Sequence, residues 1–128
     1  MRAALTVWED RISPVFDVSK ETLIIETVNN EVVSREHGLI SPQGPLDKID
    51  WLVRRGVDTL ICGAVSESIY RELQFYKLTV YGFIAGRVDD VIDAFVRGSL
   101  GDEKFLMPGC GGRNRERRRR HRNRGASE

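Results

Sequence analysis

Short apolar segments alternate with polar breaks along the first hundred residues of the chain. Three early segments are rich in β-branched residues and too short for helices, so each predicts a strand. They cover residues 3–8, 22–28 and 31–35. Asn29-Asn30 separates the last two, and asparagine tolerates the left-handed backbone of a tight turn. The pattern therefore predicts a β-hairpin at this pair.

Later segments change to helical spacing. Apolar residues recur every three or four positions in three stretches, which begin at Pro45, at Ser66 and after Gly86. Pro45 suits the first position of a helix, and Ser66 can cap one because its hydroxyl accepts a bond from a first-turn N–H. Two further predicted strands, 59–62 and 78–84, separate these helices.

This order of elements predicts one α/β domain over residues 1–106. Strands that alternate with helices pair in parallel through crossovers, whereas the first three strands form an antiparallel meander. We therefore expect a mixed five-stranded sheet, an antiparallel meander followed by parallel strands, with helices on its faces. Ligands of such sheets bind beyond the carboxyl ends of the parallel strands.

The candidate site lies at that edge of the predicted sheet. The run Cys62-Gly63-Ala64-Val65-Ser66 joins a strand to a helix through a glycine turn. Backbone N–H groups at the start of a helix favour anionic ligands. The candidate contacts for an anion are therefore Cys62, at the mouth of the turn, with Gly63, Ala64 and Ser66.

The loop of residues 8–17 is expected at the same edge if the first strand runs parallel to the strand that ends at Cys62. This loop adds Arg11 and Ser13 to the candidate contacts. An alternative for Arg11 is a salt bridge with Asp17 that only shapes the loop. Trp8 is expected to be a packing residue.

Cys62 and Cys110 are candidate metal ligands, since a thiolate is a soft ligand for iron or copper. The alternative for Cys62 is a core position, because free cysteine packs as a small hydrophobe. Cys110 lies in a glycine-rich setting beside arginines, which lower the pKa of a thiol. No spaced Cys/His quartet is present, so a structural zinc or four-cysteine cluster is not expected.

The charge is unevenly distributed. Residues Arg113–Arg124 hold eight arginines, whereas residues 1–112 hold 12 basic and 17 acidic residues, a net charge of −5. Dense like charge with almost no apolar residues predicts that residues 107–128 form a disordered tail. Such a tail can bind nucleic acid or an acidic partner protein, contact the acidic body, or stay solvated.

No apolar run reaches the roughly 20 residues that a membrane span needs, and Glu9 and Asp10 interrupt the N-terminus before a signal sequence develops. We therefore expect a cytoplasmic protein without a membrane partner. The two widely separated cysteines fit a reducing compartment.

Several segments resemble the dinitrogenase iron–molybdenum cofactor biosynthesis family. Arg11-Ile12-Ser13-Pro14-Val15-Phe16-Asp17 is similar to a loop of that family, and Cys62-Gly63-Ala64-Val65, Tyr81-Gly82 and residues 84–100 are similar to its second half. Many members carry a His-Phe-Gly-Arg-like element after the first loop, where this chain has Val15-Phe16-Asp17-Val18-Ser19. The resemblance implies a ribonuclease H-like fold. It also implies a protein that binds, holds or passes on a preassembled iron–sulfur-type or molybdenum-containing cluster.

We therefore expect a non-enzymatic carrier with cluster donor and acceptor proteins as partners. No Ser/His/Asp or P-loop pattern occurs, and the predicted strands carry too few acids for the paired magnesium ions of a nuclease. The alternative function is an interaction module that docks through its basic tail. The expected cofactor contacts are Arg11, Ser13, Cys62, Gly63, Ala64 and Ser66, and the expected metal ligands are Cys62 and Cys110.

Overall fold

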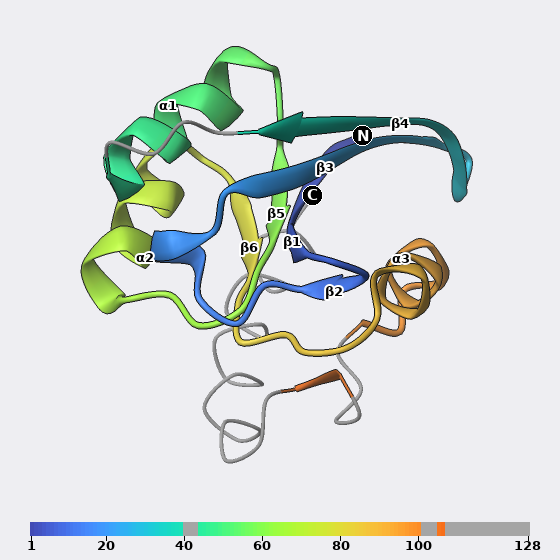
Figure 1. Ribbon diagram of the computed structural model, residues 1–128. Helices are drawn as coiled ribbons and strands as arrows, with labels where there is room; N and C mark the ends of the chain where they lie inside the picture. Colours follow the sequence, from blue (N-terminus) through green and yellow to red (C-terminus); the bar gives the residue numbers. More distant parts are fainter. Residues whose placement is uncertain (40–43, 101–104, 107–128) are drawn as a thin grey trace.

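A computed structural model describes residues 1–39, 44–100 and 105–106 (Figure 1). Its strands are β1 (Arg2–Trp8), β2 (Arg11–Ile12), β3 (Glu21–Val28), β4 (Glu31–Leu39), β5 (Thr59–Ile61) and β6 (Thr79–Tyr81). Its helices are α1 (Pro45–Arg54), α2 (Glu67–Phe75) and α3 (Val88–Arg97), with a 3-10 turn, η1, at Phe16–Val18. The predicted tail of residues 107–128, with Cys110, lies outside the described residues and stays a prediction.

The strands form one mixed sheet in the order β4-β3-β1-β5-β6. β3 is antiparallel to both β1 and β4, and β1, β5 and β6 are parallel. The predicted meander and the predicted parallel strands are therefore confirmed, as are the three helices. The hairpin is also confirmed, because Asn29 and Asn30 have φ angles of 52° and 64°.

The predicted number of five strands is wrong, because the sheet has six strands in the part of the chain that the structure describes. The additional strand, β2, folds back antiparallel onto the end of β1 and pairs Val7 with Ile12 and Trp8 with Arg11. Two residues are too few to show the alternation from which strands are predicted.

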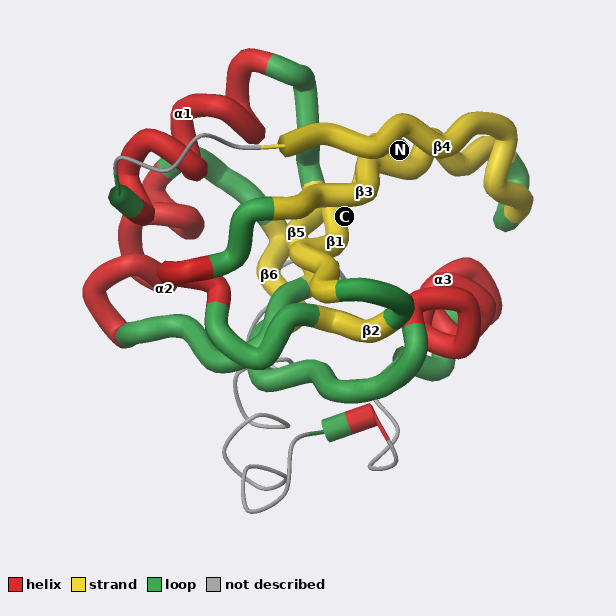
Figure 2. The backbone as a smooth tube through the Cα atoms, in the orientation of Figure 1, coloured by secondary structure: helices red, strands yellow, loops and turns green. Residues whose placement is uncertain are grey.

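Helices cover both faces of the sheet, with α1 and α2 on one face and α3 on the other (Figure 2). Alternate residues of β1 supply both layers. Leu5 and Val7 pack toward α3, whereas Ala4 packs toward α1 and α2. We call these the α3 face and the α1/α2 face. Two hydrophobic layers therefore hold the sheet and fix its carboxyl-end edge.

Candidate functional site

The predicted edge forms as expected, because β1 and β5 are parallel and their carboxyl ends meet. Residues 13–20, which we call the covering loop, lie directly on the turn that follows β5. The Ala64 N–H donates to the Pro14 carbonyl at 2.7 Å, and the Phe16 N–H donates to the Ala64 carbonyl at 2.9 Å. The structure thus brings together Ser13, Gly63 and Ala64 through backbone contacts.

These contacts overturn the expectation of an open, amide-lined turn. A methyl group placed on Gly63 would lie less than 3.0 Å from the carbonyl oxygens of Ser13 and Pro14. Two carbonyl oxygens therefore occupy the position at which an anion was expected, and the Ala64 N–H is already bonded. In this conformation Gly63 and Ala64 form a seam between two chain segments.

Cys62 is also not at the mouth of the turn. Its side chain is fully buried on the α1/α2 face. Burial raises the pKa of the Cys62 thiol to about 12, and the negative charge of Asp17 adds to the rise. The alternative of a core position is the one that the structure supports, so Cys62 presents no thiolate to solvent in this conformation.

The other candidates have separate positions. Ser66 caps α2, as predicted, by accepting a bond from the Ile69 N–H at 3.4 Å. Ser13 is buried and its hydroxyl donates to the Val15 carbonyl at 3.4 Å. Arg11 is exposed on β2, and within the described residues it forms no ion pair with Asp17 or any other acid.

A groove of about 530 Å³ is lined in part by the covering loop. Its walls come from the end of β1, the covering loop, the start of β3 and the end of β4. Exposed apolar side chains dominate it, with Trp8 58%, Val18 69% and Leu39 75% exposed. The lining residues are Val7, Trp8, Ser13, Pro14, Val18, Ser19, Lys20, Glu21 and Leu39.

Sequence reasoning found only Ser13 of this groove. Trp8 was expected to be a packing residue, but its side chain is 58% exposed and lines the groove. β1 alternates up to Val7, but Trp8 is its last residue, and there the strand turns into the β1–β2 hairpin. A tryptophan at the end of a strand, next to a loop, is the signal that could have indicated an exposed aromatic.

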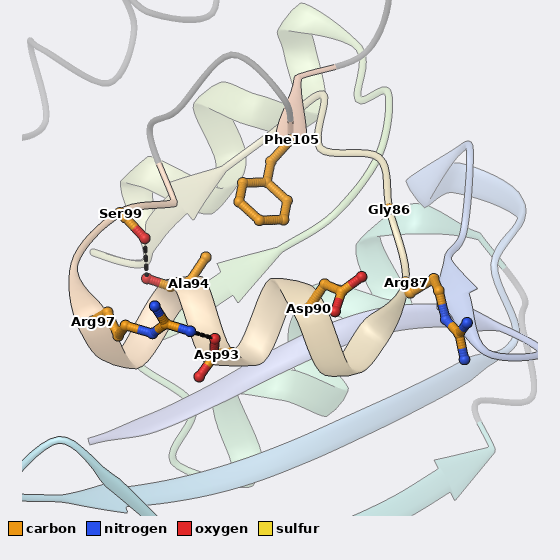
Figure 3. A pocket seen from close by; sticks show the side chains of 8 residues that line it. All are labelled: Gly86, Arg87, Asp90, Asp93, Ala94, Arg97, Ser99 and Phe105. Carbon is orange, nitrogen blue, oxygen red and sulfur yellow. Dashed lines mark hydrogen bonds and ion pairs between the residues drawn. The ribbon is translucent and has the colours of Figure 1, made fainter.

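A second cavity of about 410 Å³ lies along α3 (Figure 3). Its charges are balanced, because Asp90 and Asp93 face the same cavity as Arg87 and Arg97. Arg97 pairs with Asp93, and Arg87 pairs with Asp10 at 3.6 Å. The cavity therefore has little net preference for an anion.

No cluster of three or more His, Cys, Asp or Glu side chains that could hold a metal ion is found in the part of the chain that the structure describes. In the same part, none of the helices has the length and apolar character needed to cross a membrane.

Comparison with known proteins identifies the family. The family model described as dinitrogenase iron-molybdenum cofactor matches residues 1–98. The chain belongs to this family.

Alignments with similar proteins cover most of this chain and nearly all of each similar protein. The uncharacterized protein MJ0327 of Methanocaldococcus jannaschii is 29% identical over 100 residues, which cover 78% of this chain and 91% of the relative. A crystal structure of MJ0327 aligns with a TM-score of 0.66 at 27% identity over 77% of this chain and 90% of that chain. The crystal structure of PH0822 aligns with a TM-score of 0.73 at 20% identity, over 77% of this chain and 90% of that chain, and shares the fold.

Proposed function

We propose that this protein is a non-enzymatic carrier that receives a preassembled iron–sulfur-type or molybdenum-containing cluster from a donor protein and passes it to an acceptor. Membership of the dinitrogenase iron-molybdenum cofactor family is the observation that carries the proposal. A carrier holds its cargo reversibly, which suits a site without a full ligand set.

The side chains near the groove fit such a cargo in part. The described residues offer no group of three metal ligands, so the cluster must arrive with its own sulfides and ligands. Such clusters are anionic. Lys20 and Ser13 line the groove, and Arg11 lies opposite Trp8 in the β1–β2 hairpin. We propose that these groups and the Trp8 ring form the first contact with the cargo.

Tetrathiomolybdate, a coloured molybdenum–sulfide dianion, is a suitable probe under anaerobic conditions. We expect it to bind and to quench Trp8 fluorescence in a Trp51→Phe background. Lys20→Glu should weaken this binding by about three- to tenfold, because the variant replaces an attractive charge by a repulsive one near the solvent. Arg11→Ala should weaken it in the same direction.

Phe75→Ala is the matched control. Phe75 is exposed at the end of α2, at the opposite edge of the sheet, so its loss should leave the affinity unchanged. Equal losses in Lys20→Glu and Phe75→Ala would show that the groove is not the contact. A protein that binds neither tetrathiomolybdate nor a reconstituted iron–sulfur cluster would contradict the carrier function itself.

A second candidate function rests on the eight arginines of Arg113–Arg124. We propose that this segment docks the protein on nucleic acid or on an acidic partner protein. Arginines neutralise phosphates, so binding to a mixed-sequence RNA should weaken steeply with salt.

Deletion of residues 113–128 should abolish this RNA binding and remove its salt dependence, as measured by fluorescence anisotropy at several salt concentrations. Replacement of the eight arginines by lysines keeps the charge and should keep most of the binding. Unchanged binding after the deletion would rule out the tail as the contact.

We also propose that the fold is ribonuclease H-like and that the protein works in the cytoplasm. The five strands of the main sheet path support the fold assignment, since only β3 runs antiparallel to the others. Two cysteines that are far apart in sequence fit a reducing compartment.

A further inference from the structure

A row of buried polar side chains crosses the sheet beneath the covering loop. Thr6 of β1 lies directly opposite Thr22 of β3 in the strand register. The neighbouring pair Leu5–Ile61 places Thr6 beside Cys62 on the other side. All three side chains belong to the α1/α2 face, because Ala4, Ile24 and Leu60, two residues away from each, pack there.

This row is unusual because its hydroxyls have no partners. Thr6 is 0% and Thr22 is 1% exposed, and neither hydroxyl oxygen forms a hydrogen bond with any described residue. One carboxylate oxygen of Asp17, in the covering loop, is buried and unpartnered as well. Buried polar groups are normally bonded, so each such group disfavours the closed conformation.

A buried charge lies at the same interface. The Lys48 side chain is fully buried, and its ammonium group donates to the Phe16 carbonyl and, at 3.4 Å, to the Ser19 hydroxyl. The Phe16 carbonyl already accepts bonds from the N–H and the hydroxyl of Ser19. Burial lowers the pKa of Lys48 to about 8, although the Asp17 charge opposes this, so the closed loop disfavours the charged form.

Asp17 lies in the covering loop and Lys48 of α1 bonds to that loop. Thr6 and Thr22 lie on the face of the sheet against which Phe16 of the loop packs. Lifting the loop would hydrate the ammonium group of Lys48, the carboxylate of Asp17 and the hydroxyls of Thr6 and Thr22 together. The same movement would expose the Cys62 thiol, whose pKa is raised by burial and by the Asp17 charge in the closed conformation. Ser13, Pro14, Val18 and Ser19 of this loop line the groove, whereas Cys62 does not line it and is fully buried.

We propose that Cys62, Thr6 and Thr22 form a concealed second contact for the cluster, which the cargo reaches when the covering loop lifts. The inference rests on the proposed carrier function. In the open state, the Cys62 thiolate replaces one exchangeable ligand, a water or a thiolate, on one metal of the cluster, and the Cys62 proton passes to water or to a departing thiolate. The two threonine hydroxyls donate to sulfides of the cluster, and Lys48 balances its charge.

Thiol labelling tests the opening without any cargo. In a Cys110→Ser background, Cys62 is the one remaining cysteine. We expect N-ethylmaleimide to label native Cys62 at a rate that low denaturant concentrations do not change, which is the mark of local opening. Lys48→Met should slow the labelling about tenfold, because the variant removes the charge that the closed loop disfavours.

Ile92→Val is the control for global stability. Ile92 is buried on α3, on the other face of the sheet, so the variant should destabilise the fold and leave the labelling rate unchanged. A labelling rate that rises in Ile92→Val in step with global unfolding would overturn the opening of the covering loop.

Binding of a preassembled iron–sulfur cluster that carries exchangeable thiolate ligands tests the contact itself. The bound cluster should protect Cys62 from labelling, and Cys62→Ser should weaken its binding at least tenfold while Lys20→Glu retains the protection at saturation. Binding that persists unchanged in Cys62→Ser would overturn the concealed contact and leave the carrier function standing. Labelling of Cys62 in a protein that binds no cluster would overturn both.

Discussion

Gly63→Ala should unfold the protein or destabilise it by about 3 kcal/mol or more, the upper end for an overpacked core. The added methyl group would meet the carbonyl oxygens of Ser13 and Pro14 at less than 3.0 Å, and neither oxygen belongs to a flexible side chain. The covering loop would have to move away from the turn. That movement would break the bonds between Ala64 and Pro14 and between Phe16 and Ala64.

Gly82→Ala is the matched control for this substitution. The methyl group placed on Gly82 meets the Val65 side chain at 3.3 Å, a contact that a small side-chain movement can relieve. Urea unfolding of the two variants at pH 7 should therefore show a much larger loss for Gly63→Ala. Equal losses would contradict the close seam between the covering loop and the turn.

Much of the architecture could be predicted because the spacing of apolar residues and the turn and cap residues between segments depend on local structure. The β-branched runs of the early strands, the pair Asn29-Asn30 and the cap at Ser66 each depend on residues close in sequence, and each is confirmed. β2 was missed because its two residues obtain their strand geometry from pairing with β1.

The candidate site was harder to predict for a different reason. A strand, a glycine turn and a helix start do form an anion-binding arrangement when nothing covers them. Here Ser13 and Pro14 lie about fifty residues earlier in the chain. Their carbonyl groups pack on Gly63 and fill the space beside the turn. Glycine at this position permits another group to approach the chain closely. The sequence does not show whether that group is a ligand or another segment of the protein.

Lys48 gave no signal in the sequence at all. It lies in α1 between apolar residues at helical spacing, and a lysine in a helix is normally solvated. Its burial arises because the covering loop, which is distant in sequence, folds over it. The three-dimensional structure alone shows that Lys48 lies beside the covering loop, which carries Asp17 and packs on the sheet face of Thr6 and Thr22.

Lys48→Met should stabilise the protein by about 1–3 kcal/mol at pH 7, because an apolar side chain of similar length replaces a buried charge. The gain should depend on pH. The pKa of Lys48 falls from 10.5 to about 8 on folding, so the wild-type fold carries the full penalty below pH 8 and is relieved of it as the pH rises toward 10.5. The stability difference should therefore shrink over this window, as measured by urea unfolding from pH 7 to pH 10.

Two features keep this result interpretable. The pKa of Cys62 is raised on folding, from 9.0 to about 12, so this thiol lowers the stability above pH 9, but it does so in both proteins and cancels in the difference. Lys48→Arg keeps a cation that does not lose its proton, so the stability of this variant should not approach that of Lys48→Met at high pH.

A Lys48→Met protein that is less stable than wild type at pH 7 would mean that the ammonium group holds the covering loop closed. A stability difference that stays constant across the pH window would mean that Lys48 titrates normally and that its charge does not work against loop closure.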